Sequence, residues 1–177
     1  MNPIDMLLIM VGIGIVFFLA YQRMARALFA LGVLWAVSLI CGLLYEEAAY
    51  RVQAVAGSNV PLTEGIMFIL LLVIFFVVGY VLVHVSFPET RLPKIGSLDV
   101  LMGLLLGIVV ATIFVALLQN ALGVMVRERW VDARSWNTWH SYFVRSSLRP
   151  ISRTILTLWR QLLAPFFPGL PPALTPQ

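Results

Sequence analysis

Four long apolar runs occupy most of this 177-residue chain, and each is close to the length that crosses a lipid bilayer. A helix rises about 1.5 Å per residue, so about 20 apolar residues span a hydrocarbon core about 30 Å thick. Because lipid offers backbone groups no hydrogen-bond partners, such runs must be helical. The sequence therefore predicts an all-α membrane protein with four transmembrane helices, at Ile4–Tyr21, Ala27–Tyr45, Gly65–Val85 and Val100–Val126.

Charge is scarce and unevenly placed along the chain. Charged residues make up 11% of the sequence and lie almost wholly between the apolar runs, whereas a soluble domain carries about a quarter. We expect a four-helix transmembrane domain at 1–126, an Arg- and Trp-rich interfacial region at 127–164 and a Pro-rich extended tail at 165–177. The excess of 12 Lys and Arg over 8 Asp and Glu favours anionic lipid headgroups as a partner, and we expect no nucleic-acid binding.

The connections between the runs predict how the helices follow one another. Arg23 and Arg26 lie in a short link, which we expect to span about five residues and to fold the first two helices into an antiparallel hairpin. The second helix is expected to continue past Tyr45 as a solvent-exposed helical segment, because Glu47 and Arg51 are four residues apart and share a helix face. The third helix is expected to begin near Thr63. The basic first link favours both termini outside the cell, although the arginines of the tail pull the other way.

The region after residue 126 has the composition of a membrane interface. Seven arginines alternate with tryptophan and tyrosine, whose apolar bodies and polar edges favour the headgroup level. Apolar residues from Ile151 to Leu163 recur at helical spacing, which predicts an amphipathic helix of about 14 residues lying in the interface. The interface anchors we expect are Trp130, Trp136, Trp139, Arg153, Trp159 and Arg160.

Small and acidic residues mark the start of the fourth apolar run. Gly103, Gly107 and Ala111 are spaced four apart on one helix face, a pattern that lets another backbone approach closely. That backbone belongs either to this chain or to a second copy in a homo-oligomer. Asp5 and Asp99 each lie in the first turn of a helix, where the helix dipole favours a carboxylate. Because the two helices are antiparallel, we expect the two carboxylates on opposite membrane faces, as capping groups or as functional polar contacts.

The sequence contains no arrangement typical of catalysis or of cofactor binding. Cys41 is the sole cysteine, and neither His84 nor His140 has a second ligand at metal-binding spacing. Phosphate-binding loops and nucleophile elbows are also missing. Gln119 and Asn120 are expected where the fourth helix leaves the hydrocarbon, so strong polarity near the midplane, which transporters tend to show, is lacking. We therefore expect no enzyme, no metal and no cofactor.

Three segments share one pattern with a known family: Asn2-Pro3-Ile4-Asp5 before the first run, the basic link from Tyr21 to Ala27, and Leu98-Asp99 followed by Gly103 and Gly107. Their order and positions resemble the colicin V production protein (CvpA) family of bacterial inner-membrane proteins. The resemblance covers residues 2–125. It departs at Ala20, Met24 and Ala25, where the family usually carries glycine, and in the missing acidic residue after the arginines.

The resemblance implies a non-enzymatic, four-helix protein of the bacterial inner membrane, linked to toxin production or secretion and to envelope physiology. The resemblance assigns no catalytic role to any residue. The positions shared with the family are Asp5, Asp99, Gly103 and Gly107. Two alternatives remain open from the residues. One is an accessory subunit of a larger respiratory or photosynthetic membrane complex, and the other is a small channel or carrier.

Overall fold

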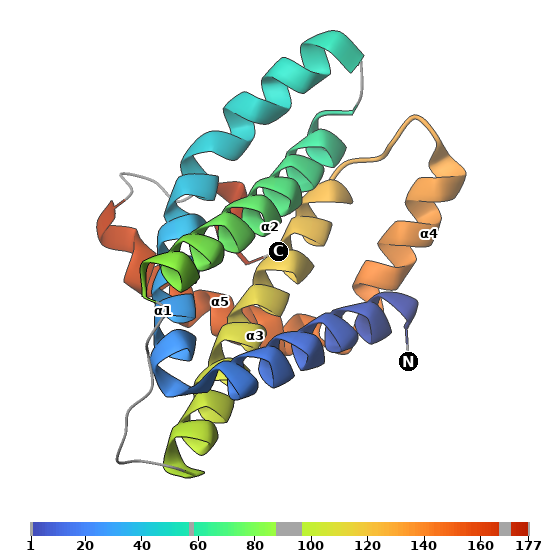
Figure 1. Cartoon of the computed structure of the whole chain (residues 1–177). Coiled ribbons are helices and arrows are strands. Elements are labelled where there is room, and N and C mark those ends of the chain that lie inside the picture. Colours follow the sequence, from blue (N-terminus) through green and yellow to red (C-terminus); the bar gives the residue numbers. More distant parts are fainter. Residues whose placement is uncertain (1, 57–58, 88–96, 167–170, 177) are drawn as a thin grey trace.

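The described part of the chain is mostly helical and contains no strand. The computed structural model (Figure 1) describes residues 2–56, 59–87, 97–166 and 171–176. Its helices are α1 (Pro3–Ala56), α2 (Val60–Ser86), α3 (Ser97–Met125), α4 (Ala133–Val144) and α5 (Arg149–Leu163), followed by the short 3-10 helices η1 (Ala164–Phe166) and η2 (Pro172–Leu174). The predicted all-α class is confirmed for these residues. Three of the helices, α1, α2 and α3, are long and apolar enough to cross a membrane.

Helix α1 contains a sharp bend at Arg23. Arg23 has φ 72° and ψ 179°, and no other residue of α1 leaves the helical region. The bend separates a first arm (3–22) from a second arm (24–56), and Figure 1 shows the chain reversing there. We expected a link of about five residues between two helices, but helix resumes directly at Met24. Arg23 combines a positive φ with an extended ψ, a region that is essentially confined to glycine. One residue in this conformation is enough to redirect the chain, at a cost of about 1–3 kcal/mol.

The helices extend beyond the ends of the apolar runs, as far as the polar and proline-containing segments that separate them. The second arm of α1 continues to Ala56, where the Glu47–Arg51 ion pair (2.9 Å) lies on its exposed surface. Helix α2 begins at Val60, earlier than the expected Thr63, because Pro61 occupies its first turn, a position where a missing N–H costs nothing.

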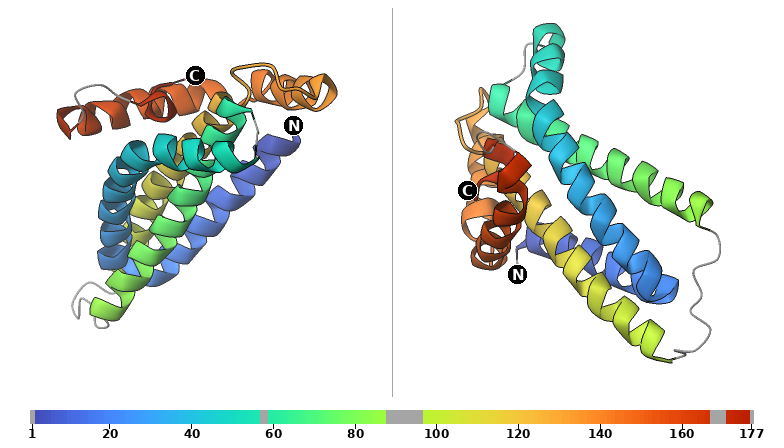
Figure 2. Two further views of the ribbon diagram at one scale, coloured as in Figure 1. Left: turned by 90° about the horizontal axis from the view of Figure 1, so that it is seen from above. Right: turned by 90° about the vertical axis from the view of Figure 1, so that its left-hand side faces the viewer.

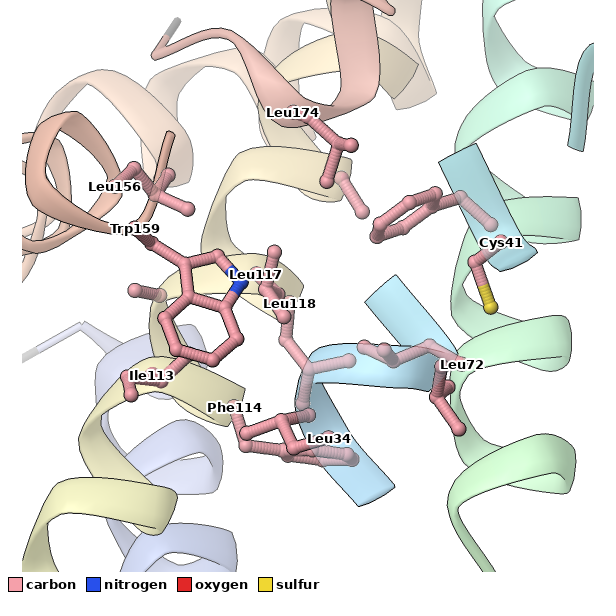
Figure 3. Packing of buried hydrophobic residues seen from close by; sticks show 14 of the residues in the cluster. Leu34, Cys41, Leu72, Ile113, Phe114, Leu117, Leu118, Leu156, Trp159 and Leu174 are labelled. Atoms are coloured by element: carbon pink, nitrogen blue, oxygen red, sulfur yellow. The ribbon is translucent and has the colours of Figure 1, made fainter. Parts of the chain in front are cut away.

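The core lies where α3 packs against both arms of α1 and against α2. Leu34 and Cys41 of α1, Leu72 of α2 and Leu117 of α3 are fully buried. Figure 3 shows these side chains together, with Trp159 and Leu156 reaching from α5 toward Ile113 and Leu117 of α3.

Helices α4 and α5 lie on one side of the bundle. Figure 2 shows them on the same side as both chain ends, while the bend at Arg23 lies at the far end of the first arm. Helix α5 packs on α3, and α4 makes smaller contacts with α1.

The C-terminal tail differs from the extended segment that we expected. Residues Pro172–Leu174 form the 3-10 helix η2, and Ala173 and Leu174 are buried against α3. Proline composition predicted an absence of regular helix, but it carries no information on tertiary burial. The apolar Ala173 and Leu174 are covered because α3 presents Asn120 as a hydrogen-bond donor to the tail backbone.

Candidate functional site

Asp99 joins the start of α3 to the bend in α1. Its carboxylate is fully buried and accepts a hydrogen bond from the Met24 N–H at 3.0 Å. The Arg23 guanidinium lies 3.7 Å from the other carboxylate oxygen. The Met24 amide begins the second arm, and a first-turn amide has no acceptor within its own helix. Asp99 therefore caps the second arm of α1 from a different helix.

The small-residue face of α3 packs against the first arm of the same chain. A Cβ built on Gly103 would lie 2.8 Å from the carbonyl carbon and 2.9 Å from the Cα of Arg23. A Cβ on Gly107 would lie 3.3 Å from the Leu19 Cβ and 3.3 Å from the Val16 carbonyl oxygen. Ala111, one turn further along, is 4% exposed. Of the two partners left open by the sequence, the structure places the internal one on this face.

A second close contact of this kind escaped the sequence analysis. A Cβ on Gly65 would lie 2.7 Å from the Ala121 carbonyl oxygen and 2.1 Å from the Met125 Cγ. The contact joins the start of α2 to the end of α3. The residues four positions before and after Gly65 in α2 are Pro61 and Ile69. Neither is a small residue, so the spacing gave no signal.

Asp5 joins the N-terminus to the turn between α4 and α5. It is 1% exposed and accepts hydrogen bonds from the Ser146 hydroxyl at 2.5 Å and from the Ser147 N–H at 3.0 Å. Close by, the Asn2 side chain donates to the Tyr142 carbonyl oxygen. These contacts tie together segments more than a hundred residues apart in the chain.

The two buried carboxylates serve opposite ends of the first arm. Asp5 lies at the N-terminal end of the arm, against the α4–α5 turn, and Asp99 lies beside the bend at Arg23. Eighteen residues separate Asp5 from Arg23, which at about 1.5 Å each is about 27 Å along a helix. The two carboxylates therefore make separate contacts: Asp5 holds the α4–α5 turn and Asp99 caps the second arm of α1. The distance between them excludes a single site that contains both.

Gln119 and Asn120, which are expected where the fourth helix leaves the hydrocarbon, are both buried within the protein, at 1% and 3% exposed. The Asn120 amide nitrogen donates to the carbonyl oxygens of Ala173 (2.7 Å) and Thr175 (2.9 Å). The folded-back tail and α5 cover this end of α3, which is why polar residues become buried there.

Five of the six expected anchors lie at or near the surface. The indole N–H of Trp130 donates to the Met125 carbonyl oxygen at 2.7 Å, and that of Trp136 to the Val126 carbonyl oxygen at 3.3 Å. Both tryptophans are half-buried, while Trp139, Arg153 and Arg160 are exposed.

Trp159 is placed differently from the other anchors. It is 6% exposed, and its indole N–H points to the Ser38 hydroxyl of α1 at 3.3 Å. Burial of this side chain is tolerated because the polar edge finds a partner inside the protein. Trp159 is therefore part of the core that holds α5 on the bundle.

An apolar groove of about 460 Å³ lies between the first arm of α1 and helix α2. Aromatic and aliphatic side chains line most of it, and Gln22 and His84 lie along its polar part. The titratable groups in the described lining are one histidine, His84, and one tyrosine, Tyr80. Across the described residues, His, Cys, Asp and Glu nowhere gather in a group of three that could hold a metal.

Comparison of the chain with protein-family models, with curated proteins and with solved structures gives no match. The fold therefore defines a helical protein with three helices that are long and apolar enough to cross a membrane.

Proposed function

We propose that the chain is a four-span protein of the bacterial inner membrane, related to the colicin V production proteins. In this proposal it acts without catalysis, through helix packing and contacts with partner proteins, in toxin production or secretion or in envelope physiology. The observation that carries the proposal is the way α3 holds the bend in α1. Asp99 accepts a hydrogen bond from the Met24 N–H, and Gly103 packs against the Arg23 backbone.

Length supports two crossings within α1. A straight helix of its 54 residues would be about 81 Å long, far more than a hydrocarbon core of about 30 Å. The bend divides it into arms of 20 residues (3–22) and 33 residues (24–56), and each arm is long enough to cross. With α2 and α3 this gives four spans, with both chain ends on one side.

The hydrogen bonds of the two buried carboxylates support a structural role, because Asp5 and Asp99 both bind groups of this same chain. The oxygens of Asp5 bind the α4–α5 turn, and Asp99 binds the start of the second arm and faces Arg23. A carboxylate that caps a helix terminus is already neutralised in part by the terminal amides. These contacts favour a scaffold over an ion pathway.

The test uses paired glycine variants in a strain that depends on the protein for toxin production or envelope integrity. We expect Gly103→Leu with Gly107→Leu to lose stability and complementing activity, because both positions contact α1 directly. Gly14→Leu is the matched control, since no atom lies within 4 Å of a Cβ built there. Wild-type stability, oligomeric state and complementation in the double variant would contradict the proposal. Ion flux in proteoliposomes that is lost in Asp99→Asn would favour a channel instead.

The accessory-subunit alternative has one candidate surface for a partner protein. It is the apolar flank of α5 formed by Ile151, Leu158 and Leu162, which are 55%, 60% and 58% exposed. Gentle detergent extraction followed by native electrophoresis separates the two cases. Migration as a small species supports the scaffold, and comigration with a large complex supports the subunit.

A further inference from the structure

Gln119 is a buried amide without a partner. The residue is 1% exposed, and neither its amide nitrogen nor its amide oxygen has a hydrogen-bond partner in the described structure. Buried polar groups are satisfied in the great majority of cases, so an unpartnered buried amide that lines a cavity is a candidate ligand-binding group. The side chain lines a small cavity between α3, the last turn of α4 and the first turns of α5. The other polar lining residues are Asn120, Arg149, Ser152 and Arg153.

The cavity is strongly basic. Arg149 and Arg153 are one helical turn apart in α5 and both line it. The Arg149 Nε is buried and has no hydrogen-bond partner in the described structure, and its guanidinium is held 4.8 Å above the Phe143 ring. Desolvation, and to a lesser degree the charge of Arg153, lower the pKa of Arg149. In the described structure no carboxylate lies within ion-pair distance of Arg149.

The start of α5 adds to this positive potential. Arg149 is the first residue of the 15-residue helix, and no side chain caps its start in the described structure. The amide dipoles of a helix favour an anion at its N-terminus. A site that combines a helix start, two guanidinium groups and a neutral amide donor has the chemistry that recognises phosphate.

We propose that the Gln119 cavity binds a phosphate group, either of a phospholipid headgroup or free in solution. The cavity holds about 10 Å³, room for a single water-sized atom such as one phosphate oxygen. That oxygen accepts a hydrogen bond from the Gln119 amide, and the remaining oxygens lie at the mouth beside Arg149 and the exposed Arg153.

The surface around the cavity is suited to a lipid headgroup. Helix α5 turns Leu156, Trp159 and Leu163 toward the protein, its exposed apolar flank lies beside them, and its arginines at 149, 153 and 160 share a further face. A helix of this pattern lies in the headgroup region with its basic face toward lipid phosphates. The choice of a lipid source rests on the proposed membrane location, whereas binding of phosphate itself does not.

The experiment measures binding to the purified full chain in an uncharged detergent. Phosphatidylglycerol is titrated and counted by native mass spectrometry, and inorganic phosphate is tested separately at constant ionic strength by its effect on the melting temperature. We expect one tight phosphatidylglycerol, with affinity about 10-fold lower in Arg149→Gln and in Arg153→Gln, because each removes a charge-assisted contact. Gln119→Leu is expected to weaken binding as well.

Arg160→Gln is the matched control, since it removes the same charge from the same face of α5 but lies outside the cavity lining. Its affinity is expected to stay within about 2-fold of wild type. Arg153 is exposed, so its variant folds even where Arg149→Gln does not. Stabilisation by inorganic phosphate would show a soluble source, and binding of phosphatidylglycerol alone would show a lipid source; both support the site.

Equal losses in the Arg153 and Arg160 variants would show general charge attraction and would overturn the site, as would the absence of binding to both probes. Neither result affects the four-span proposal, because membrane insertion and crossing number are measured independently of any bound phosphate.

Discussion

Gly103 lies directly against the backbone of Arg23, at the point where α1 reverses. The distance from a Cβ built on Gly103 to the Arg23 carbonyl carbon would be 2.8 Å, which no real side chain accepts. This close backbone approach of α3 is therefore made to the residue with the positive φ, 72°. Any residue larger than glycine at position 103 must displace the bend.

We predict that Gly103→Ala destabilises the protein by about 1–3 kcal/mol, the usual cost of overpacking a close contact. The measurement is the unfolding free energy, or the melting temperature, in a fixed detergent. Gly14→Ala and Gly32→Ala are the controls, because a Cβ at either position meets no atom within 4 Å. These controls should remain within about 1 kcal/mol of wild type or become slightly more stable. Equal behaviour of Gly103→Ala and the controls would contradict the close contact.

Variants of Asp99 test whether its hydrogen bond to Met24 or its charge pair with Arg23 stabilises the bend in α1. Asp99→Ala leaves the Met24 N–H without its acceptor, and we expect a loss of about 1–3 kcal/mol. Asp99→Asn keeps an acceptor oxygen and loses only the charge pair with Arg23, whose side chain is 40% exposed; we expect a loss below about 1 kcal/mol. Thermal unfolding of the two variants gives the comparison. If Asn is as damaging as Ala, the charge and not the helix cap holds the bend.

Asp5 is predicted to hold the α4–α5 turn on the bundle. Asp5→Ala removes the acceptor of Ser146 and Ser147, so the turn should open locally while the long helices stay folded. The measurement is amide hydrogen exchange, and we expect faster exchange at Ser147 and around it. Glu47→Ala, which removes an exposed ion pair with Arg51, is the control and should leave exchange in this turn unchanged. Unchanged protection of Ser147 in Asp5→Ala would show that the contact does not hold the turn.

The C-terminal segment is predicted to contribute to stability. Ending the chain at residue 170 removes the buried Ala173 and Leu174 and leaves Asn120 without the two carbonyl oxygens that it binds. Fully burying a leucine side chain contributes about 1.5–3 kcal/mol, so the melting temperature in detergent should fall clearly. Ending the chain at residue 175 keeps these contacts and is the control. An unchanged melting temperature after the longer truncation would show that the tail does not pack as described.

The sequence predicted the helical class and the long apolar helices because hydrophobic length and backbone hydrogen bonding are local properties. It also predicted a close approach at Gly103, Gly107 and Ala111, since small residues four apart can serve little else in an apolar helix. The identity of the partner was not predictable, because spacing describes one helix and not the surface that it meets. For the same reason Asp5 was placed in a first helical turn without its contacts to Ser146 and Ser147.

The placement of several residues in the C-terminal half of the chain was not predictable, because the composition of a segment does not show what that segment packs against. Trp159 has the character of an interface residue, but Ser38 offers its N–H a partner within the core. The prolines near the C-terminus predicted an extended segment, yet Asn120 and the neighbouring apolar surface bind it. Gln119 and Asn120 had the character of helix-exit residues and became the polar lining of a buried cavity. Each difference arises from contacts between segments far apart in the chain.

The most direct test of the four-span account is the sidedness of single cysteines. Cys41 is first replaced by alanine, and cysteine is then introduced singly at Tyr21, beside the bend, at Ala54, near the end of α1, and at Thr157 of α5; all three positions are exposed. Labelling of intact cells with a membrane-impermeant thiol reagent, with and without permeabilisation, reports the side of each position. If the chain crosses four times, positions 54 and 157 share one side of the membrane and position 21 lies on the other. Labelling of position 21 from the same side as the other two would contradict the four-span account.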